Sequence, residues 1–83
     1  MDIRITYCGM WNYLPKAQVV SLELKENFEN INVELIKGSG GVFDVVLLGD
    51  GYNEGDRILY SKTITKRFPY DDEIFHIVAK LLN

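Results

Sequence analysis

Cysteine is almost absent from this chain of 83 residues, which contains only Cys8. A single cysteine excludes an internal disulfide, so any disulfide chemistry must involve a second molecule. The sequence also lacks an apolar run of membrane-spanning length, and its first residues lack the pattern of a secretion signal. We therefore expect a cytoplasmic protein with no membrane partner.

Basic residues are outnumbered, with 9 Lys and Arg against 12 Asp and Glu and a net charge of −3. The basic residues are scattered, and the densest group is Lys62, Lys66 and Arg67. Nucleic-acid binding usually requires a concentrated basic patch, so we expect no nucleic-acid partner. The length and the apolar fraction of 47% are those of one globular domain, which we place at residues 1–83.

The first half of the chain has a strand pattern followed by a helix pattern. Apolar and polar residues alternate over residues 3–7, which predicts a strand. Helical spacing then predicts a helix over residues 13–28, with Asn12 as its N-cap and Pro15 in its first turn. The apolar stripe of this helix is Leu14, Ala17, Val20, Leu24 and Phe28.

The second half predicts three strands and a helix. Residues 33–37 and 57–61 have strand patterns, and the nearly continuous apolar run 42–48 is typical of an inner strand buried on both faces. A last helix follows a cap at Asp71 or Asp72. The order β-α-β-β-β-α predicts an α/β fold of the thioredoxin-like kind, a four-stranded mixed sheet with two helices.

Cys8 lies where the first strand ends, shortly before the first helix. Unpaired N–H groups and the dipole at a helix start favour a thiolate and lower the pKa of a thiol placed there. Apolar bulk from Trp11 would act in the opposite direction. The alternative is that Cys8 packs as a small buried apolar group.

Three segments carry a family resemblance over nearly the whole chain. They are residues 8–14 (CGMWNYL), residues 38–45 (GSGGVFDV), and Ser61-Lys62 followed after four residues by Arg67-Phe68-Pro69. In this order and spacing they resemble the selenoprotein W, T and H (Rdx) family, and most closely its bacterial selenoprotein W-like members. The resemblance implies a thioredoxin-like fold and redox chemistry at the Cys-x-x-Cys motif of that family.

The chain departs from the family at its central motif. Trp11 stands where the second cysteine or selenocysteine of the motif is found, so the chain cannot complete a dithiol cycle alone. The remaining redox prediction is a monothiol reaction in which Cys8 forms a mixed disulfide with glutathione, as a co-substrate, or with a thiol protein. Two further departures are Lys66, at a frequent glycine position, and the long loop tip at residues 50–56.

A second hypothesis assigns the same region to binding without catalysis. Met10, Trp11 and Tyr13 would form an exposed patch of the kind enriched in interaction hot spots, and the alternative is that they pack in the core. Solvent exposure distinguishes the hypotheses, since a redox site needs an accessible Cys8 sulfur and a binding patch needs an accessible Trp11. Dimerisation through an edge strand is left open.

Other candidate sites are weak. We expect His76 on the surface, and one cysteine with one histidine makes a poor zinc site. The acidic tip with Asp50, Glu54 and Asp56 lacks the spacing of an EF-hand loop. The glycines at 38–41 precede a strand and are better explained as a turn than as a phosphate loop. We therefore expect no metal and no cofactor apart from glutathione.

Overall fold

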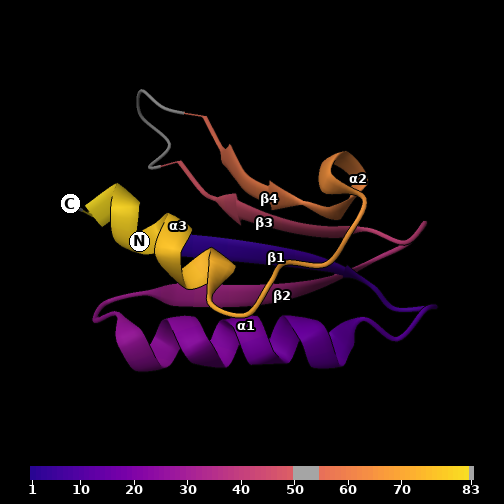
Figure 1. Cartoon of the computed structure of the whole chain (residues 1–83), viewed down its shortest axis with the longest axis horizontal. Coiled ribbons are helices and arrows are strands. Elements are labelled where there is room, and N and C mark those ends of the chain that lie inside the picture. The colour runs from indigo at the N-terminus through magenta and orange to yellow at the C-terminus, as the bar shows by residue number, and fades with distance from the viewer. Residues whose placement is uncertain (50–54, 83) are drawn as a thin grey trace.

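The computed structural model describes residues 1–49 and 55–82. Its elements confirm the predicted order β-α-β-β-β-α and add one short helix between the last strand and the last long helix (Figure 1). They are β1 (Asp2–Cys8), α1 (Leu14–Asn27), β2 (Asn32–Gly38), β3 (Phe43–Leu47), β4 (Arg57–Ser61), α2 (Lys62–Thr65) and α3 (Glu73–Leu82).

The four strands form one mixed sheet in the order β2-β1-β3-β4. β1 runs parallel to β2 and antiparallel to β3, and β4 is antiparallel to β3, so the sheet is mixed, as the sequence predicted. Ile5 pairs with Leu35 on one side and with Val45 on the other, which fixes the register of the inner strands. α1 packs on β1 and β2, while α3 contacts α1 and β4.

The core lies between the two long helices and one face of the sheet. Alternation along β1 and β3 places Ile3, Ile5, Phe43 and Val45 on this face, where they are fully buried. The predicted stripe of α1 is confirmed, because Ala17, Val20 and Leu24 are buried. The remaining members of the core are Tyr60, Ile74 and Val78.

The opposite face of the sheet is more open than the sequence suggested. β3 is an inner strand, as predicted, but Asp44 and Val46 on its outer face are only half-buried. Ile58, which pairs with Val46, is exposed, as is Ile36 on β2. A nearly continuous apolar run therefore did not mean burial on both faces, because both long helices cover the same face.

The predicted N-cap of α1 was wrong by one residue. The cap is Tyr13, which has no side-chain capping hydrogen bond, and Asn12 instead has a left-handed backbone with φ 59°. Asn tolerates this conformation better than most residues, so it serves the turn before the helix and not the cap. Pro15 does lie in the first turn, as predicted.

Helix α2 is a single turn that the sequence pattern did not reveal. Four residues are too few to show helical periodicity, so the sequence analysis predicts no element between residue 61 and the cap of the last helix. The turn closes where the Lys66 N–H donates to the Lys62 carbonyl at 2.7 Å. Lys66 has φ 66°, a left-handed conformation that favours glycine, which gives a physical reason for the glycine frequent here in the family.

The loop between β3 and β4 is described only at its two ends. The Gly49 N–H donates to the Asp56 carboxylate at 3.0 Å, closing the base of this connection. Asp50 and Glu54, from the acidic tip considered for calcium, lie outside the described residues. Within residues 1–49 and 55–82, no helix is long and apolar enough to cross a membrane.

Candidate functional site

Cys8 is the last residue of β1 and begins a tight turn that leads into α1. Its N–H donates to the Val42 carbonyl at 2.8 Å, and its carbonyl accepts from the Tyr13 N–H at 3.0 Å. The Gly9 N–H donates to the Gly38 carbonyl at 3.2 Å. These bonds join the turn at residues 8–13 to the glycine-rich loop at residues 38–42, so both loops build the surroundings of the thiol.

The Cys8 side chain is fully buried, with an exposed fraction of 0%. A buried sulfur is unreachable for an external disulfide in this conformation. By the exposure criterion that separates the two hypotheses, the resting structure therefore lacks the accessible sulfur that a redox site needs.

The environment of the thiol nevertheless favours its ionised form. Desolvation raises the pKa of Cys8, but the backbone N–H groups of Trp11, Gly41 and Met10 donate to the sulfur and together bring the pKa below its ordinary value. Stabilisation of the thiolate by such donors is the usual route to a reactive cysteine. The direction agrees with the sequence analysis, although the donors are loop amides and α1 begins only at Leu14.

The Trp11 ring lies against Gly41, one of these donors. A Cβ atom added at Gly41 would come within 2.9 Å of Trp11 Cζ3, closer than real Cβ contacts, and Gly41 has φ +77°. Glycine is therefore required here for two reasons, its left-handed backbone and the close approach of the ring. This contact joins the exposed side chain of Trp11 to the loop that holds the thiol.

Trp11 and Met10 are exposed, with fractions of 60% and 87%. The Trp11 ring meets Tyr13 edge to face with centroids 6.1 Å apart, and Tyr13 meets Phe68 in the same manner at 4.7 Å. Phe68 in turn contacts the buried Phe43 at 5.5 Å. An aromatic row thus connects the hydrophobic core to solvent at the end of the molecule where β1 passes into α1.

Two lysines lie over this aromatic row. The Lys62 ammonium is 5.5 Å from the centroid of Tyr13 and 5.3 Å from that of Phe68, and the Lys16 ammonium is 5.3 Å from Phe68. These are cation–π distances. We call the set of Met10, Trp11, Tyr13, Phe68, Lys16 and Lys62 the Trp11 surface.

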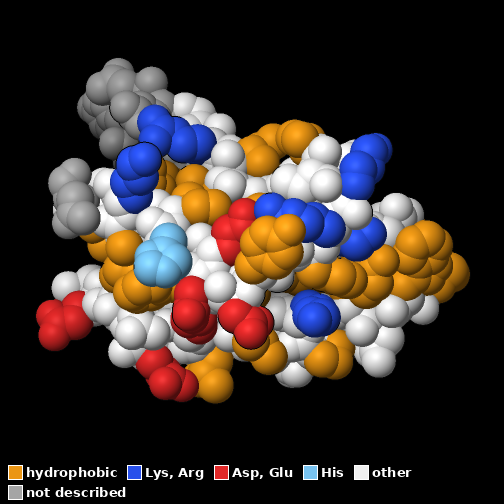
Figure 2. All heavy atoms as spheres, viewed as in Figure 1, with side chains coloured by type: hydrophobic (Ala, Val, Ile, Leu, Met, Phe, Trp, Pro, Cys, Tyr) orange, Lys and Arg blue, Asp and Glu red, His pale blue; other side chains and the backbone are white. Residues whose placement is uncertain are grey.

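Figure 2 shows the distribution of side-chain types on one face of the molecule. Apolar side chains gather at the end where β1 passes into α1, with Lys and Arg side chains around them. Asp and Glu side chains gather farther along, over α1 and α3. The Trp11 surface therefore combines apolar area with positive charge in a protein whose net charge is −3.

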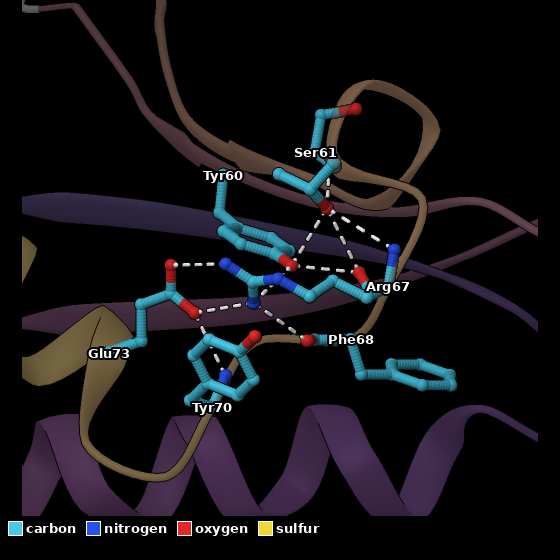
Figure 3. A network of polar contacts seen from close by, with 7 residues as sticks. Tyr60, Ser61, Arg67, Phe68, Tyr70 and Glu73 are labelled. Carbon is cyan, nitrogen blue, oxygen red and sulfur yellow. Dashed lines mark hydrogen bonds and ion pairs between the residues drawn. The ribbon is translucent and has the colours of Figure 1, made fainter.

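Phe68 is held in place by the hydrogen bonds of Arg67 (Figure 3). The Arg67 guanidinium donates to both Glu73 carboxylate oxygens, at 2.8 and 3.2 Å, and to the Phe68 carbonyl at 3.1 Å. It also donates to the Tyr60 hydroxyl at 3.2 Å and stacks on the Tyr70 ring at 3.9 Å. Hydrogen bonding to Arg67 lowers the pKa of Glu73. The network ties the segment after α2 to the start of α3.

A groove of about 540 Å³ lies between α1 and the segment before α3. Its apolar floor includes Phe43 and Ile74, and Glu23, Asp71 and Asp72 line its walls. Desolvation and a hydrogen bond with Asp72 raise the pKa of Glu23. Among the described residues, no group of three or more His, Cys, Asp or Glu side chains is placed to hold a metal ion.

The sequence analysis found part of this site. It identified Cys8, Met10, Trp11 and Tyr13, which the structure brings together, and it placed His76 on the surface, where it is exposed. It missed the lysines at positions 16 and 62, because spacing alone could not place them beside the rings. It noted Phe68 in a family segment without assigning it to the site, and that segment was the available signal.

Comparison with known proteins gives the same assignment for the fold. A crystal structure of a selenoprotein W-related protein from Vibrio cholerae has a TM-score of 0.80 and 23% identity, with 99% of this chain and 96% of that chain covered. A crystal structure of a protein from Bordetella parapertussis has a TM-score of 0.77 and 27% identity, with coverages of 95% and 94%. No curated protein matches the sequence.

The family assignment comes from the sequence itself. The model of the Rdx family matches residues 2–80, nearly the whole chain. This match agrees with the resemblance carried by the three segments at residues 8–14, 38–45 and 61–69. The chain belongs to the Rdx family.

Proposed function

We propose that this chain is a small redox-associated thioredoxin-like protein in which Cys8 forms a mixed disulfide with glutathione or with a thiol protein. The observation that carries the proposal is the position of Cys8 at the end of β1, in the turn before α1, where hydrogen bonding by the backbone N–H groups of Trp11, Gly41 and Met10 lowers the pKa of the thiol despite desolvation. A cysteine that merely fills space needs no such donors, since burial in apolar surroundings raises the pKa of a thiol. The Rdx family assignment supports a redox role.

The reaction is an exchange between one thiolate and a disulfide. The Cys8 thiolate attacks one sulfur of oxidised glutathione, a new S–S bond forms as the old one breaks, and one glutathione thiolate leaves. Because Trp11 replaces the second cysteine, a second external thiolate must then attack the mixed disulfide and release Cys8. The cycle therefore depends on an external disulfide in the first step and on an external thiol in the second.

Burial of Cys8 imposes an opening step before attack. The sulfur becomes reachable only when its surroundings move, and these are built by the turn at residues 8–13 and the loop at residues 38–42. The observed rate is the product of the open fraction and the reactivity of the open thiolate. We expect a reaction slower than that of an exposed thiolate, yet much faster than global unfolding would allow.

The test is the pH dependence of Cys8 alkylation in the folded protein, with mass spectrometry after exposure to oxidised glutathione. We expect an apparent pKa below the unperturbed value of about 8.5 and one glutathione adduct per chain. The Cys8→Ser variant is the control and should give no adduct. A thiol that reacts only after denaturation would contradict the monothiol proposal.

A second candidate function is favoured by the exposure of the neighbouring residues. Trp11 and Met10 are exposed, which meets the requirement of a protein-binding module, while Cys8 is fully buried. In this case a partner docks on the Trp11 surface and the thiol has no part in binding. Trp11→Ala should then weaken binding of a partner while Cys8→Ser leaves it unchanged, whereas a mixed-disulfide partner should be lost in Cys8→Ser.

A further inference from the structure

We infer that the Trp11 surface receives an acidic segment of a partner protein. The inference deepens the proposed function, because this surface borders the loop that holds Cys8. It depends on three features of the described residues: the positions of the lysines, the absence of carboxylate partners for them, and the exposure of the apolar residues between them.

Three lysines lie at this end of the molecule. Lys16 and Lys62 are held over the rings of the aromatic row, and the Lys37 side chain lies against Gly9, in the same turn as Cys8. The screening length at physiological salt is about 8 Å, so a partner senses these nearby charges more strongly than the net charge of the chain. The local field at the Trp11 surface is therefore positive in an acidic protein.

The ammonium groups over the aromatic row lack carboxylate partners. The ion pairs among the described residues join Arg4 to Glu34 and Arg67 to Glu73, and neither includes Lys16 or Lys62. Both of these lysines lie over the same ring, that of Phe68, and neither forms an ion pair there. Carboxylates brought by a partner would pair with the ammonium groups and complete their hydrogen bonding.

Lys16 lines one groove together with Glu23, Asp71 and Asp72 but forms no ion pair with them, and Lys62 is not among the residues that line this groove. Glu23, Asp71 and Asp72 gather where α1 meets the segment before α3, and Asp44 projects to the other face of the sheet from Phe43.

Met10 and Trp11 supply the apolar part of the interface. Trp, Met and aromatic residues are enriched at the centres of protein interfaces, while charged residues at the rim govern selection and the rate of encounter. An exposed Met10 thioether and Trp11 indole, next to rings that carry two lysines, therefore fit a segment with an apolar anchor flanked by Asp or Glu. A nucleic-acid strand also stacks on aromatics and neutralises lysines, so it is the alternative that the experiment must test.

Trp11 is the only tryptophan of the chain, so its fluorescence reports directly on this surface. The experiment titrates the full-length Cys8→Ser protein with three peptides that share a Phe-Leu core and are flanked by Glu, by Gln or by Lys. A short single-stranded oligonucleotide is the fourth ligand. We expect the Glu-flanked peptide to bind most tightly, and its affinity to fall as salt is raised.

Charge reversal tests the assignment to these lysines. The double variant Lys16→Glu/Lys62→Glu should lose about tenfold or more of its affinity for the Glu-flanked peptide, given the usual size of two rim charge contacts. The matched control Lys25→Glu/Lys80→Glu changes the net charge equally, at exposed sites on α1 and α3, and should lose little. The inference is overturned by equal binding of all peptides, by no saturable binding of the Glu-flanked one, or by tighter binding of the oligonucleotide.

Failure of this inference is distinguishable from failure of the proposed function. The peptide titration uses Cys8→Ser and so does not depend on thiol chemistry. A glutathione adduct on wild-type Cys8 without preference for acidic peptides would remove only the inference. An unreactive thiol together with selective binding of the Glu-flanked peptide would remove the monothiol reaction and retain the acidic partner.

Discussion

Substituting Gly41 by alanine is the most direct perturbation of the candidate site. Gly41 has φ +77° and contributes one of the N–H groups that donate to Cys8, and the Trp11 ring lies over it. Gly40 is the matched control, with φ +71° and nothing within 4 Å of an added Cβ atom. The two substitutions share the cost of a left-handed alanine, so their difference isolates the contact with Trp11.

The expected magnitudes follow from the geometry. A left-handed alanine costs about 1 to 2 kcal/mol, and loss of glycine entropy from the unfolded chain offsets about 0.4 to 1 kcal/mol, leaving about 1 kcal/mol at either position. At Gly41 the added Cβ would be 2.9 Å from Trp11 Cζ3, so the ring must move. Its edge-to-face contact with Tyr13 is then weakened, a contact of a type worth about 0.5 to 1.5 kcal/mol.

Urea unfolding and the fluorescence of folded Trp11 measure these effects. We expect a loss of about 1 kcal/mol in Gly40→Ala and about 2 kcal/mol in Gly41→Ala, which corresponds to Tm decreases of about 4 to 8 °C and about 8 to 16 °C. Only Gly41→Ala should change the emission of the folded protein. In a Trp11→Ala background the two substitutions should cost the same, because the contact is gone. Equal costs in the wild-type background, or an equal change of emission, would refute the proposed packing of Trp11 on Gly41.

Three further predictions concern the rest of the chain. Glu73→Gln should be less stable than wild type at pH 7, because Arg67 lowers the pKa of Glu73 in the folded state. Urea unfolding should show the difference in stability between variant and wild type shrinking as the pH falls from about 4.3 through that folded-state pKa. Glu23→Gln should have the opposite effect on stability, since the raised folded-state pKa makes wild type lose stability as Glu23 ionises. Thermal unfolding should show the variant more stable than wild type at pH 7, by about 0.5 kcal/mol, and equally stable below pH of about 4. Lys66→Gly should stabilise the protein by about 0.5 kcal/mol in urea unfolding, because glycine adopts the left-handed backbone of φ 66° without strain. A loss of stability instead would show that contacts of the Lys66 side chain stabilise the fold.

Much of the fold could be predicted because local patterns and the global arrangement agree. The stripe of Ala17, Val20 and Leu24 fixed which face of α1 is buried, and the βαβ order fixed the parallel pairing of β1 with β2. The one-turn helix α2 gave no such signal, because four residues show no period. The prediction that β3 is buried on both faces was wrong because an apolar run shows only that the strand is apolar. It does not show which elements cover each face of the strand.

The site could be predicted only in part, for a different reason. The place of Cys8 between a strand and a helix follows from element order, but the donors to its sulfur come from loops whose backbone directions no periodicity encodes. Gly41 directs its N–H toward the thiol because its backbone has a φ of +77°. A glycine in the sequence allows this conformation but does not require it. Lys62 reaches Phe68 because Lys66, with its left-handed backbone, closes the intervening turn, and spacing alone cannot show this.

Ionisation of the Cys8 thiol and burial of its sulfur depend on the same residues. The amides that stabilise the thiolate belong to Met10, Trp11 and Gly41, the residues whose side chains or contacts form the neighbouring surface. Movement that uncovers Cys8 therefore also removes donors and returns the pKa toward its ordinary value, so a freely opened thiol would be less ionised. Opening therefore exchanges ionisation of the thiol for access to the sulfur, and the Cys8 that an external disulfide meets should have a higher pKa than the buried Cys8.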